Sequence, residues 1–228
     1  MIIVRGKLTE QMDAAALRAR AAACDGVTID LGTGDGRFTY RYALEHPQRL
    51  VIGIDPVREN LRELSARAAR KPDRGGAANA LYVVASIEQP PPELRGIADE
   101  ILVTLPWGSL MRGIIVADDA VLAAIASMAR AGAALRIVLN TRIFDDPVPV
   151  EVRDLPEVTP DYVRDVLSPA YARHGIEITS ARWMEAEEVA AIGTTWAKRL
   201  SHRHPPRSVM IVATVGRHPF LPGGAAGG

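Results

Sequence analysis

Five short apolar runs, separated by stretches of helical composition, constrain the fold of this 228-residue chain more than any other feature. The runs cover residues 27–31, 50–55, 81–85, 101–105 and 135–139. Their apolar residues follow one another without alternation, which is typical of strands buried on both faces of a parallel sheet. Helical patterns cover residues 10–23, 37–45, 58–71 and 119–130. Strands that alternate with helices predict a doubly wound α/β domain.

After the fifth run the pattern changes. Residues 145–160 contain four prolines and predict a loop or insertion, and a helix is expected over 161–173. Alternating residues predict a strand over 176–183, and a helix over 185–200 is expected before a last strand over 208–215. The expected sheet therefore has seven strands, within a single domain over 1–216 that carries an N-terminal extension and insertions between strands. The Gly-rich segment 217–228 is predicted to be disordered.

Composition excludes several classes of protein. The 27 basic and 27 acidic residues cancel, which argues against a protein that simply coats nucleic acid. We find no apolar run long enough for a membrane span and no secretory signal pattern at the start. The single cysteine, Cys24, cannot form an internal disulfide, so a reducing compartment is expected. These features predict a cytoplasmic protein that is not inserted in a membrane.

A glycine-rich turn follows the first apolar run. Glycines at 32, 34 and 36 in the sequence DLGTGDG allow the backbone to approach a ligand closely, and the next strand ends in Asp55, which is positioned to accept both hydroxyls of a ribose. This pair predicts a cofactor that contains a nucleoside. Asp30 and Asp35 beside the turn would repel a pyrophosphate but suit a sulfonium cation with an amino group. The sequence therefore favours S-adenosylmethionine over NAD.

Three further features are candidates for contact with a ligand, and the loop with Trp107 lies at the carboxyl edge of such a sheet, where ligands bind. Residues 86–88 are expected to flank the adenine of the cofactor, with a solvated Glu88 as the equal alternative. Trp107, in a loop after the fourth run, is a candidate for stacking, and its alternative is packing on the core. Trp196 is a second stacking candidate, whereas Trp183 is expected in the core.

Four segments of the chain resemble one known family. DLGTGDGR (30–37), GIDPVRENL (53–61), PWGSLMRG (106–113) and TTWAKRL (194–200) are similar to the 16S rRNA (adenine(1408)-N(1))-methyltransferases. These are aminoglycoside-resistance enzymes of the KamB and NpmA type. The order and spacing of the motifs match over nearly the whole chain, apart from the Gly-rich tail. The resemblance implies a class I S-adenosylmethionine-dependent methyltransferase with a Rossmann-like, mostly parallel sheet.

The resemblance also implies roles for individual residues. Trp107 and Trp196 would sandwich the target adenine after it leaves its stack, since a base inside a helix cannot present its N1 atom. Adenine N1 has a free lone pair, so we expect no general base. No metal site is expected either, because His202 and His204 have no third ligand within reach in the sequence. The cofactor is expected to contact Asp30, Gly32, Thr33, Gly34, Arg37, Asp55, Pro56, Ser86, Ile87, Glu88, Thr104, Leu105, Pro106, Ser109 and Thr194.

Two clusters of basic residues predict an RNA-docking surface. Together they hold eight cations and one acid, Asp73, and both are expected at the same edge of the sheet as the cofactor. The first consists of Arg67, Arg70, Lys71 and Arg74, and the second of Lys198, Arg199, Arg203 and Arg207. Arg153 is a further candidate contact. The resemblance implies a monomer that docks on the 30S ribosomal subunit, at helix 44 of 16S rRNA.

Two other functions remain open at this point. A tRNA guanine-N7 methyltransferase shares the same core, but the motif around Trp196 and the lack of that group's extra acidic signatures weigh against it. A small-molecule methyltransferase would have an enclosing lid and no paired basic clusters. A cofactor-binding module without catalytic activity is disfavoured, because it gives Trp107 and Trp196 no function.

Overall fold

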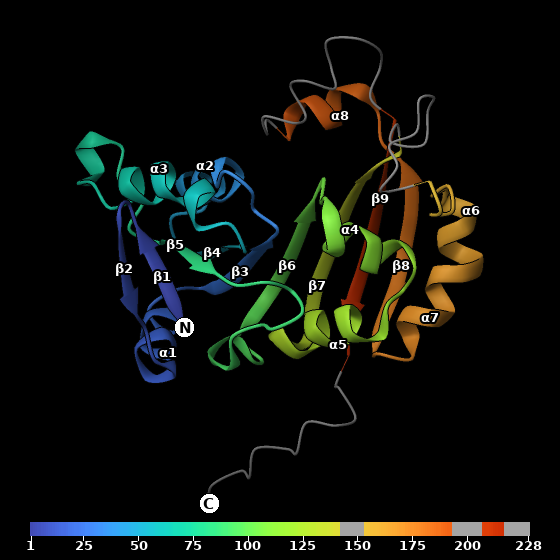
Figure 1. The fold of residues 1–228 in the computed structure, drawn as a ribbon, viewed down its shortest axis with the longest axis horizontal. Coiled ribbons are helices and arrows are strands. Elements are labelled where there is room, and N and C mark those ends of the chain that lie inside the picture. The colour runs from blue at the N-terminus through green and yellow to red at the C-terminus, as the bar shows by residue number, and fades with distance from the viewer. Residues whose placement is uncertain (142–152, 193–206, 217–228) are drawn as a thin grey trace, which may run out of the picture.

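The computed structural model describes residues 1–141, 153–192 and 207–216, and these contain one nine-stranded sheet (Figure 1). The order of strands across the sheet is β2-β1-β5-β4-β3-β6-β7-β9-β8. The strands are β1 (Ile2–Arg5), β2 (Leu8–Gln11), β3 (Gly26–Leu31), β4 (Arg49–Asp55), β5 (Ala80–Val84), β6 (Ala98–Thr104), β7 (Ala129–Asn140), β8 (Ile176–Trp183) and β9 (Ser208–Val215).

The middle of the sheet is parallel, as its continuous apolar runs predict. β3 pairs with β4 and β6 in parallel, β4 with β5, and β6 with β7. Ile29 of β3 lies between Ile52 of β4 and Ile101 of β6, and all three are fully buried. β9 runs antiparallel to both of its neighbours, β7 and β8. β1, near the other edge of the sheet, is likewise antiparallel to its neighbours β2 and β5, so the sheet is mixed with a parallel centre.

The two strands beyond the expected seven form an N-terminal hairpin. β1 and β2 are antiparallel, with Val4 opposite Thr9, and β1 joins the sheet through Ile3 opposite Val83 of β5. The hairpin replaces the first part of the helix expected over 10–23. Helix α1 (Ala14–Ala22) begins later, where the Asp13 carboxylate accepts a hydrogen bond of 2.8 Å from the Ala16 amide. An N-cap of this kind fixes the start of a helix.

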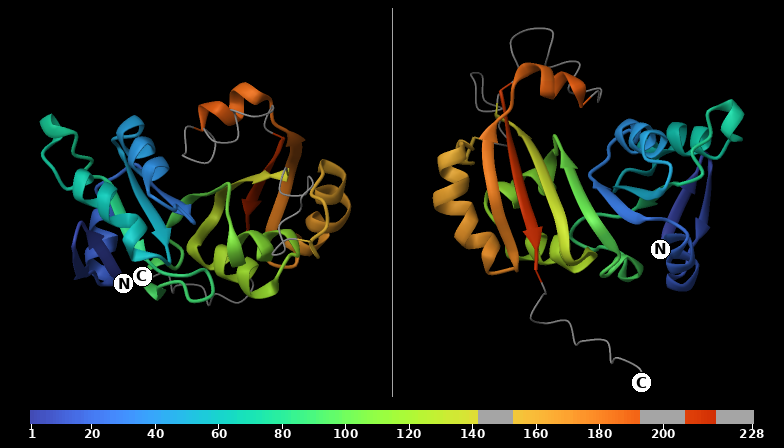
Figure 2. Two further views of the ribbon diagram at one scale, coloured as in Figure 1. Left: turned by 45° about the horizontal axis from the view of Figure 1, so that its top comes forward. Right: turned by 180° about the vertical axis from the view of Figure 1, so that it is seen from behind.

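Helices cover both faces of the sheet (Figure 2). α2 (Arg37–Glu45) and α3 (Arg58–Ala68) pack on one face, in a cluster with residues of β1, β4 and β5. A larger cluster contains buried residues of α1 and of the remaining long helices. The other helical segments are η1 (Pro72–Arg74), η2 (Pro92–Leu94), α4 (Gly108–Ile115), α5 (Asp119–Met128), α6 (Pro160–Tyr162), η5 (Val163–Leu167), α7 (Ser168–Ala172) and α8 (Ala186–Ala191).

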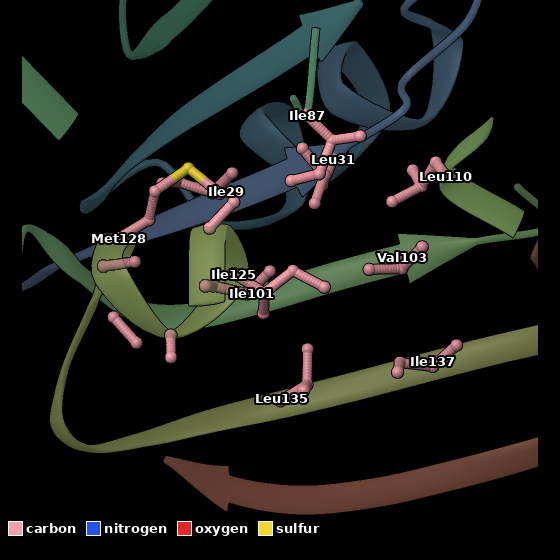
Figure 3. Close-up of a cluster of buried hydrophobic side chains, with 14 of the residues drawn as sticks. Ile29, Leu31, Ile87, Ile101, Val103, Leu110, Ile125, Met128, Leu135 and Ile137 are labelled. Carbon is pink, nitrogen blue, oxygen red and sulfur yellow. The ribbon is translucent and has the colours of Figure 1, made fainter. Parts of the chain in front are cut away.

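The larger cluster fills the space between the central strands and helices α4 and α5 (Figure 3). Ile29, Ile101, Ile125, Leu135 and Ile137 in this cluster are fully buried. Burial of such side chains contributes about 1.5–3 kcal/mol each relative to exposure. The cluster therefore anchors the carboxyl ends of β3 and β6, where the candidate site lies.

Several boundaries differ from the sequence predictions. The loop expected over 105–110 gives way at Gly108 to helix α4, and β7 begins at Ala129, where a helix to residue 130 was expected. The helix expected over 161–173 is present as three consecutive segments, α6, η5 and α7. α8 ends at Ala191 with Ile192 as its C-cap, and residues 193–200 of the helix expected over 185–200 lie outside the described residues. The segment 217–228 also lies outside them.

Candidate active site

A cavity of about 560 Å³ lies at the carboxyl ends of β3, β4, β5 and β6. In an open α/β sheet this edge is the usual place for a ligand. Its wall consists of Leu31, Gly32, Thr33, Gly34, Asp35, Phe38, Ile54, Asp55, Pro56, Val57, Asn60, Ala85, Ser86, Ile87, Glu88, Thr104, Leu105, Trp107, Gly108, Ser109 and Leu110. Eleven of the fifteen residues predicted to contact the cofactor are therefore brought together in one wall.

The glycine turn forms one side of this cavity. Gly32, Gly34 and Gly36 all have positive φ, between 58° and 75°, which L side chains rarely adopt. A Cβ atom at Gly32 would lie 2.8 Å from Leu110 Cδ2, so this glycine is also needed for packing. A Cβ atom at Gly34 would meet no heavy atom within 4 Å. The backbone at Gly34 therefore faces open space.

Asp55 closes the end of β4 beside the turn. Its carboxylate accepts hydrogen bonds of 2.9 Å from the Gly34 and Val57 amides, and one of 3.4 Å from Asn60 Nδ2. Burial raises the pKa of Asp55, and the hydrogen bonds from Val57, Gly34 and Asn60 oppose this shift. The carboxylate is fixed in the cavity wall, as the ribose-binding prediction requires.

Asp30 lies beneath the turn and is only 1% exposed. It accepts hydrogen bonds from the hydroxyls of Thr33 and Thr39, the latter at 2.6 Å. Burial raises the pKa of Asp30 to about 6, although the two threonine hydroxyls lower it. Asp30 is not part of the cavity wall. It shapes the turn and places negative charge under it.

Glu88 joins the end of β5 to the start of α4. Hydrogen bonds from the hydroxyls of Ser109 and Ser86 hold the pKa of Glu88 below its usual value. The Glu88 side chain is exposed to solvent and also belongs to the cavity wall. Neither of the two predictions, contact with adenine or a solvated carboxylate, therefore describes it fully. Its contact with the adenine of a cofactor stays a prediction.

Trp107 stands at the rim of the cavity, at the N-cap of α4. It is 48% exposed, which contradicts the alternative in which it packs on the core. Leu105, two residues before it, has a φ of +51°, a conformation that is costly for a branched side chain. The Leu105 amide donates to the Val138 carbonyl at 2.9 Å, and its side chain packs on a cluster that includes Val189 of α8. These contacts hold the turn that presents Trp107.

Some predicted contacts lie elsewhere. The exposed side chain of Arg37 turns to Asp35, with Nε 3.0 Å from Oδ2, and Pro106 is buried outside the wall. Phe38, Val57 and Asn60 belong to the wall but were not predicted. Their positions in the sequence could have indicated this, because Phe38 directly follows the motif 30–37, and Val57 and Asn60 follow Asp55 by two and five residues. Thr194, Trp196, Lys198, Arg199 and Arg203 lie outside the described residues.

The first basic cluster lies at the end of α3 and in η1. Its four side chains are exposed and make no salt bridge among residues 1–141, 153–192 and 207–216, although the Arg67 guanidinium lies 4.8 Å from the Tyr40 ring centroid. The prediction that it shares the cofactor edge is wrong, because α3 runs back from Asp55 and β5 begins at Ala80, just beyond the cluster.

Arg207 and Arg153 are the other two candidates for RNA contact among the described residues, and they lie outside the first basic cluster. Arg207 was predicted in a cluster without acids, but its Nη1 lies 3.7 Å from Glu157 Oε1 and its guanidinium 4.5 Å from the Trp183 ring centroid. Trp183 is half-buried and packs on the core as predicted. Arg153 is exposed. The described residues contain no group of three potential metal ligands and no helix that is long and apolar enough to cross a membrane.

The charge of the wall discriminates between nucleoside cofactors. The described wall contains the carboxylates of Asp35, Asp55 and Glu88 and no lysine, arginine or histidine. A pyrophosphate would find no cation there, whereas a sulfonium with an ammonium group would be stabilised. The residues present therefore fit S-adenosylmethionine. With the glycine turn, the acid at the end of β4 and the reversed strand β9, they define a class I S-adenosylmethionine-dependent methyltransferase.

Comparison with known proteins identifies the family. The model for 16S rRNA (adenine(1408)-N(1))-methyltransferase matches residues 2–215. A protein of that description from Streptoalloteichus hindustanus is 42% identical over 177 residues, which cover 78% of this chain and 81% of the relative. One from Escherichia coli is 31% identical and covers 96% of this chain and 100% of the relative. The chain belongs to this family.

Solved structures agree. A variant of the 16S rRNA (adenine(1408)-N(1))-methyltransferase from Catenulisporales acidiphilia, crystallised with SAM as cosubstrate, has a TM-score of 0.88 and 35% identity. The match covers 97% of this chain and 99% of that one. The 16S rRNA methyltransferase KamB also has a TM-score of 0.88, with 37% identity over 95% of this chain and all of its own.

Proposed function

We propose that this chain transfers a methyl group from S-adenosylmethionine to N1 of adenine 1408 of 16S rRNA in the 30S subunit, and thereby confers aminoglycoside resistance. One observation carries the proposal: the cavity that fits the cofactor has an acidic wall, and a half-exposed tryptophan, Trp107, lies at its rim. Family membership supplies the substrate.

Binding and orientation are the tasks of the wall. The backbone at Gly32 and Gly34 and the carboxylate of Asp55 would hold the ribose side of the cofactor, and residues 86–88 its adenine. Bound S-adenosylmethionine supplies an electrophilic methyl group on a cationic sulfur. The adenine N1 lone pair attacks without prior loss of a proton, so catalysis rests on positioning. The product carries a positive charge that repels the ammonium groups of an aminoglycoside.

Trp107 is the residue proposed to support the target base. Its exposed indole at the rim offers one face for an adenine that has left its helix, and Trp196 is proposed for the other. Base stacking on an aromatic side chain contributes about 1–3 kcal/mol per base. That energy is comparable with the cost of unstacking an adenine.

RNA docking is proposed for the exposed cations of the chain. Arg67, Arg70, Lys71 and Arg74 present four positive charges at the end of α3. With Arg153, Arg207 and the second cluster, they would contact phosphates near helix 44. We also propose that the protein acts as a monomer in the cytoplasm, where its substrate resides.

Primer extension on 30S subunits tests the activity directly. Subunits are incubated with the protein and S-adenosylmethionine, and reverse transcription of 16S rRNA is expected to stop one nucleotide before adenine 1408, because N1 methylation blocks base pairing. Omission of the cofactor is the control. Full-length extension through the decoding site, or methyl transfer to tRNA guanine instead, would refute the proposed substrate.

A further inference from the structure

A second cavity lies at the opposite end of α3 from Asp55. Its volume is about 230 Å³, which is below the roughly 300–1,000 Å³ of pockets for drug-sized ligands. Three arginines and no acid contribute to its wall. The wall consists of Ile3, Val4, Arg5, Arg20, Ser65, Ala68, Ala69, Arg70, Ala77, Ala78, Ala80, Leu81 and Tyr82.

The three arginines come from three elements that the fold holds together. Arg5 ends β1, Arg20 lies in the last turn of α1, and Arg70 follows α3. The hairpin is fixed to α3 by the Gly6 amide, which donates to Ser65 Oγ at 2.9 Å. Arg20 Nη2 donates to the Ala78 carbonyl at 2.5 Å. The cluster is therefore built by tertiary structure and is not a run of charge along one helix.

These cations are only partly compensated. Arg5 Nε lies 3.6 Å from Glu10 Oε1, at a site where both side chains are about half-exposed. Arg20 and Arg70 make no salt bridge among the residues described. Partial burial, followed by the nearby charge of Arg5, lowers the pKa of Arg20. Like charges that crowd one another around a hollow are stabilised by an anion bound between them.

We propose that this cavity binds a backbone phosphate of 16S rRNA, so that Arg5 and Arg20 extend the docking surface of the first basic cluster. Arginine binds phosphate through paired N–H donors, and the small volume suits a phosphate group better than a whole nucleotide. Continuity favours RNA over a free anion, because Arg70 belongs to both the cavity wall and the exposed cluster. The inference rests on the proposed function.

Filter binding of 30S subunits over a series of salt concentrations tests the assignment. Arg20→Gln and Arg5→Gln are each expected to raise the Kd for subunits roughly three- to tenfold at low salt. Each is also expected to reduce the slope of log K against log salt by about one, as for the loss of one phosphate contact. Arg18→Gln, on the exposed side of the same helix as Arg20, is the matched control and should match wild type in both quantities.

The outcomes separate three cases. An unchanged Kd for S-adenosylmethionine, measured by calorimetry, verifies that the variants are folded. If Arg20→Gln and Arg5→Gln both bind subunits as Arg18→Gln does, the inference is wrong. If inorganic phosphate raises the Tm of wild type but not of Arg20→Gln, while subunit affinity is unaltered, the cavity is a small-anion site and the RNA assignment is overturned. Failure of the proposed function would be seen in a different experiment, because wild-type protein would then give no primer-extension stop at adenine 1408.

Discussion

Asp30 is a buried carboxylic acid at the base of the site. It is enclosed beneath the glycine turn, with Thr33 and Thr39 as hydrogen-bond donors, and burial raises its pKa to about 6. In an unfolded chain an aspartate has a pKa near 3.9. The folded state therefore binds the Asp30 proton more tightly than the unfolded state does. The stability that follows is present below about pH 4 and is lost as the pH rises through 6.

Replacement of Asp30 by Asn is expected to remove this pH dependence. Wild type should lose roughly 2–3 kcal/mol of its free energy of unfolding through Asp30 between pH 4 and pH 7, and Asp30→Asn should not. The free energy of unfolding of the variant minus that of wild type should therefore rise by this amount between the two pH values. Urea denaturation at the two pH values measures the difference, in which other titrating groups cancel. A difference that stays constant with pH would mean that Asp30 titrates normally.

Trp107→Ala is expected to reduce kcat/KM for 30S methylation by about 10- to 100-fold, since one stacking face is worth about 1–3 kcal/mol. The Kd for S-adenosylmethionine should change less than threefold, because the rim position leaves the rest of the wall intact. Trp107→Phe, which keeps an aromatic face, is the control and should retain most of the activity. Equal rates for wild type and Trp107→Ala would exclude stacking on this residue.

At the scale of elements, the contact between β4 and α2 shapes the site. Gly53 of β4 faces this contact. A Cβ atom added to Gly53 would lie 2.5 Å from Thr39 Oγ1 and 3.1 Å from Thr33 Cγ2. Both threonines hold Asp30. The absence of a side chain on β4 thus allows α2 and the turn to approach the sheet closely.

Gly53→Ala is expected to displace Thr39 and destabilise the protein by about 1–3 kcal/mol, with weaker binding of S-adenosylmethionine. Thermal unfolding and calorimetry provide the two measurements. Thr39→Ala removes the atom nearest to the new methyl group, so the double variant should lose less than the sum of the single losses. Strict additivity of the two changes would show that the steric conflict is not the cause.

The elements that the sequence predicts well are those buried on both faces. β3, β4 and β6 appear within a few residues of their predicted bounds, because continuous apolar runs report burial directly. The hairpin of β1 and β2 was missed because β2 is fully exposed and leaves no apolar signal. Helix α4 was missed because its first residues, Gly108 and Ser109, favour turns.

The site was predictable as far as it is local. Residues 30–36 and Asp55 can be found by spacing, since their geometry is set by one strand–turn–helix unit. The link from Glu88 to Ser109 and the pairing of Arg207 with Glu157 depend on contacts between distant segments. The left-handed backbone of Leu105 is likewise imposed by tertiary packing. No pattern along the chain reports such contacts.

At the scale of the whole molecule, a net charge of zero hides an uneven distribution. Residues 99–188 contain 15 acids and 8 arginines, whereas the end of α3 and η1 presents four exposed cations beside a single acid. Docking on RNA requires a local basic surface, and the total charge does not report it.

Charge reversal at Arg67 or Arg74 is expected to raise the Kd for 30S subunits about tenfold or more at low salt, because a phosphate contact is replaced by repulsion. The Kd for S-adenosylmethionine should be unchanged. Arg173→Glu, at the end of α7 beside the far edge strand β8, is the control. Binding measurements in which Arg67→Glu and Arg74→Glu match the control would place the RNA on another surface.

The reversed direction of β9 also decides how this protein can be tethered. Because β9 runs against its neighbours, Val215 and Gly216 lie at the edge of the sheet opposite to the cavity, where Gly216 N donates to Gly175 O at 2.7 Å (Figure 1). A linker attached after this point leaves the molecule on the side away from Trp107. Immobilisation through a linker placed directly after Gly216 should thus orient every molecule with the cavity and Trp107 toward the solution.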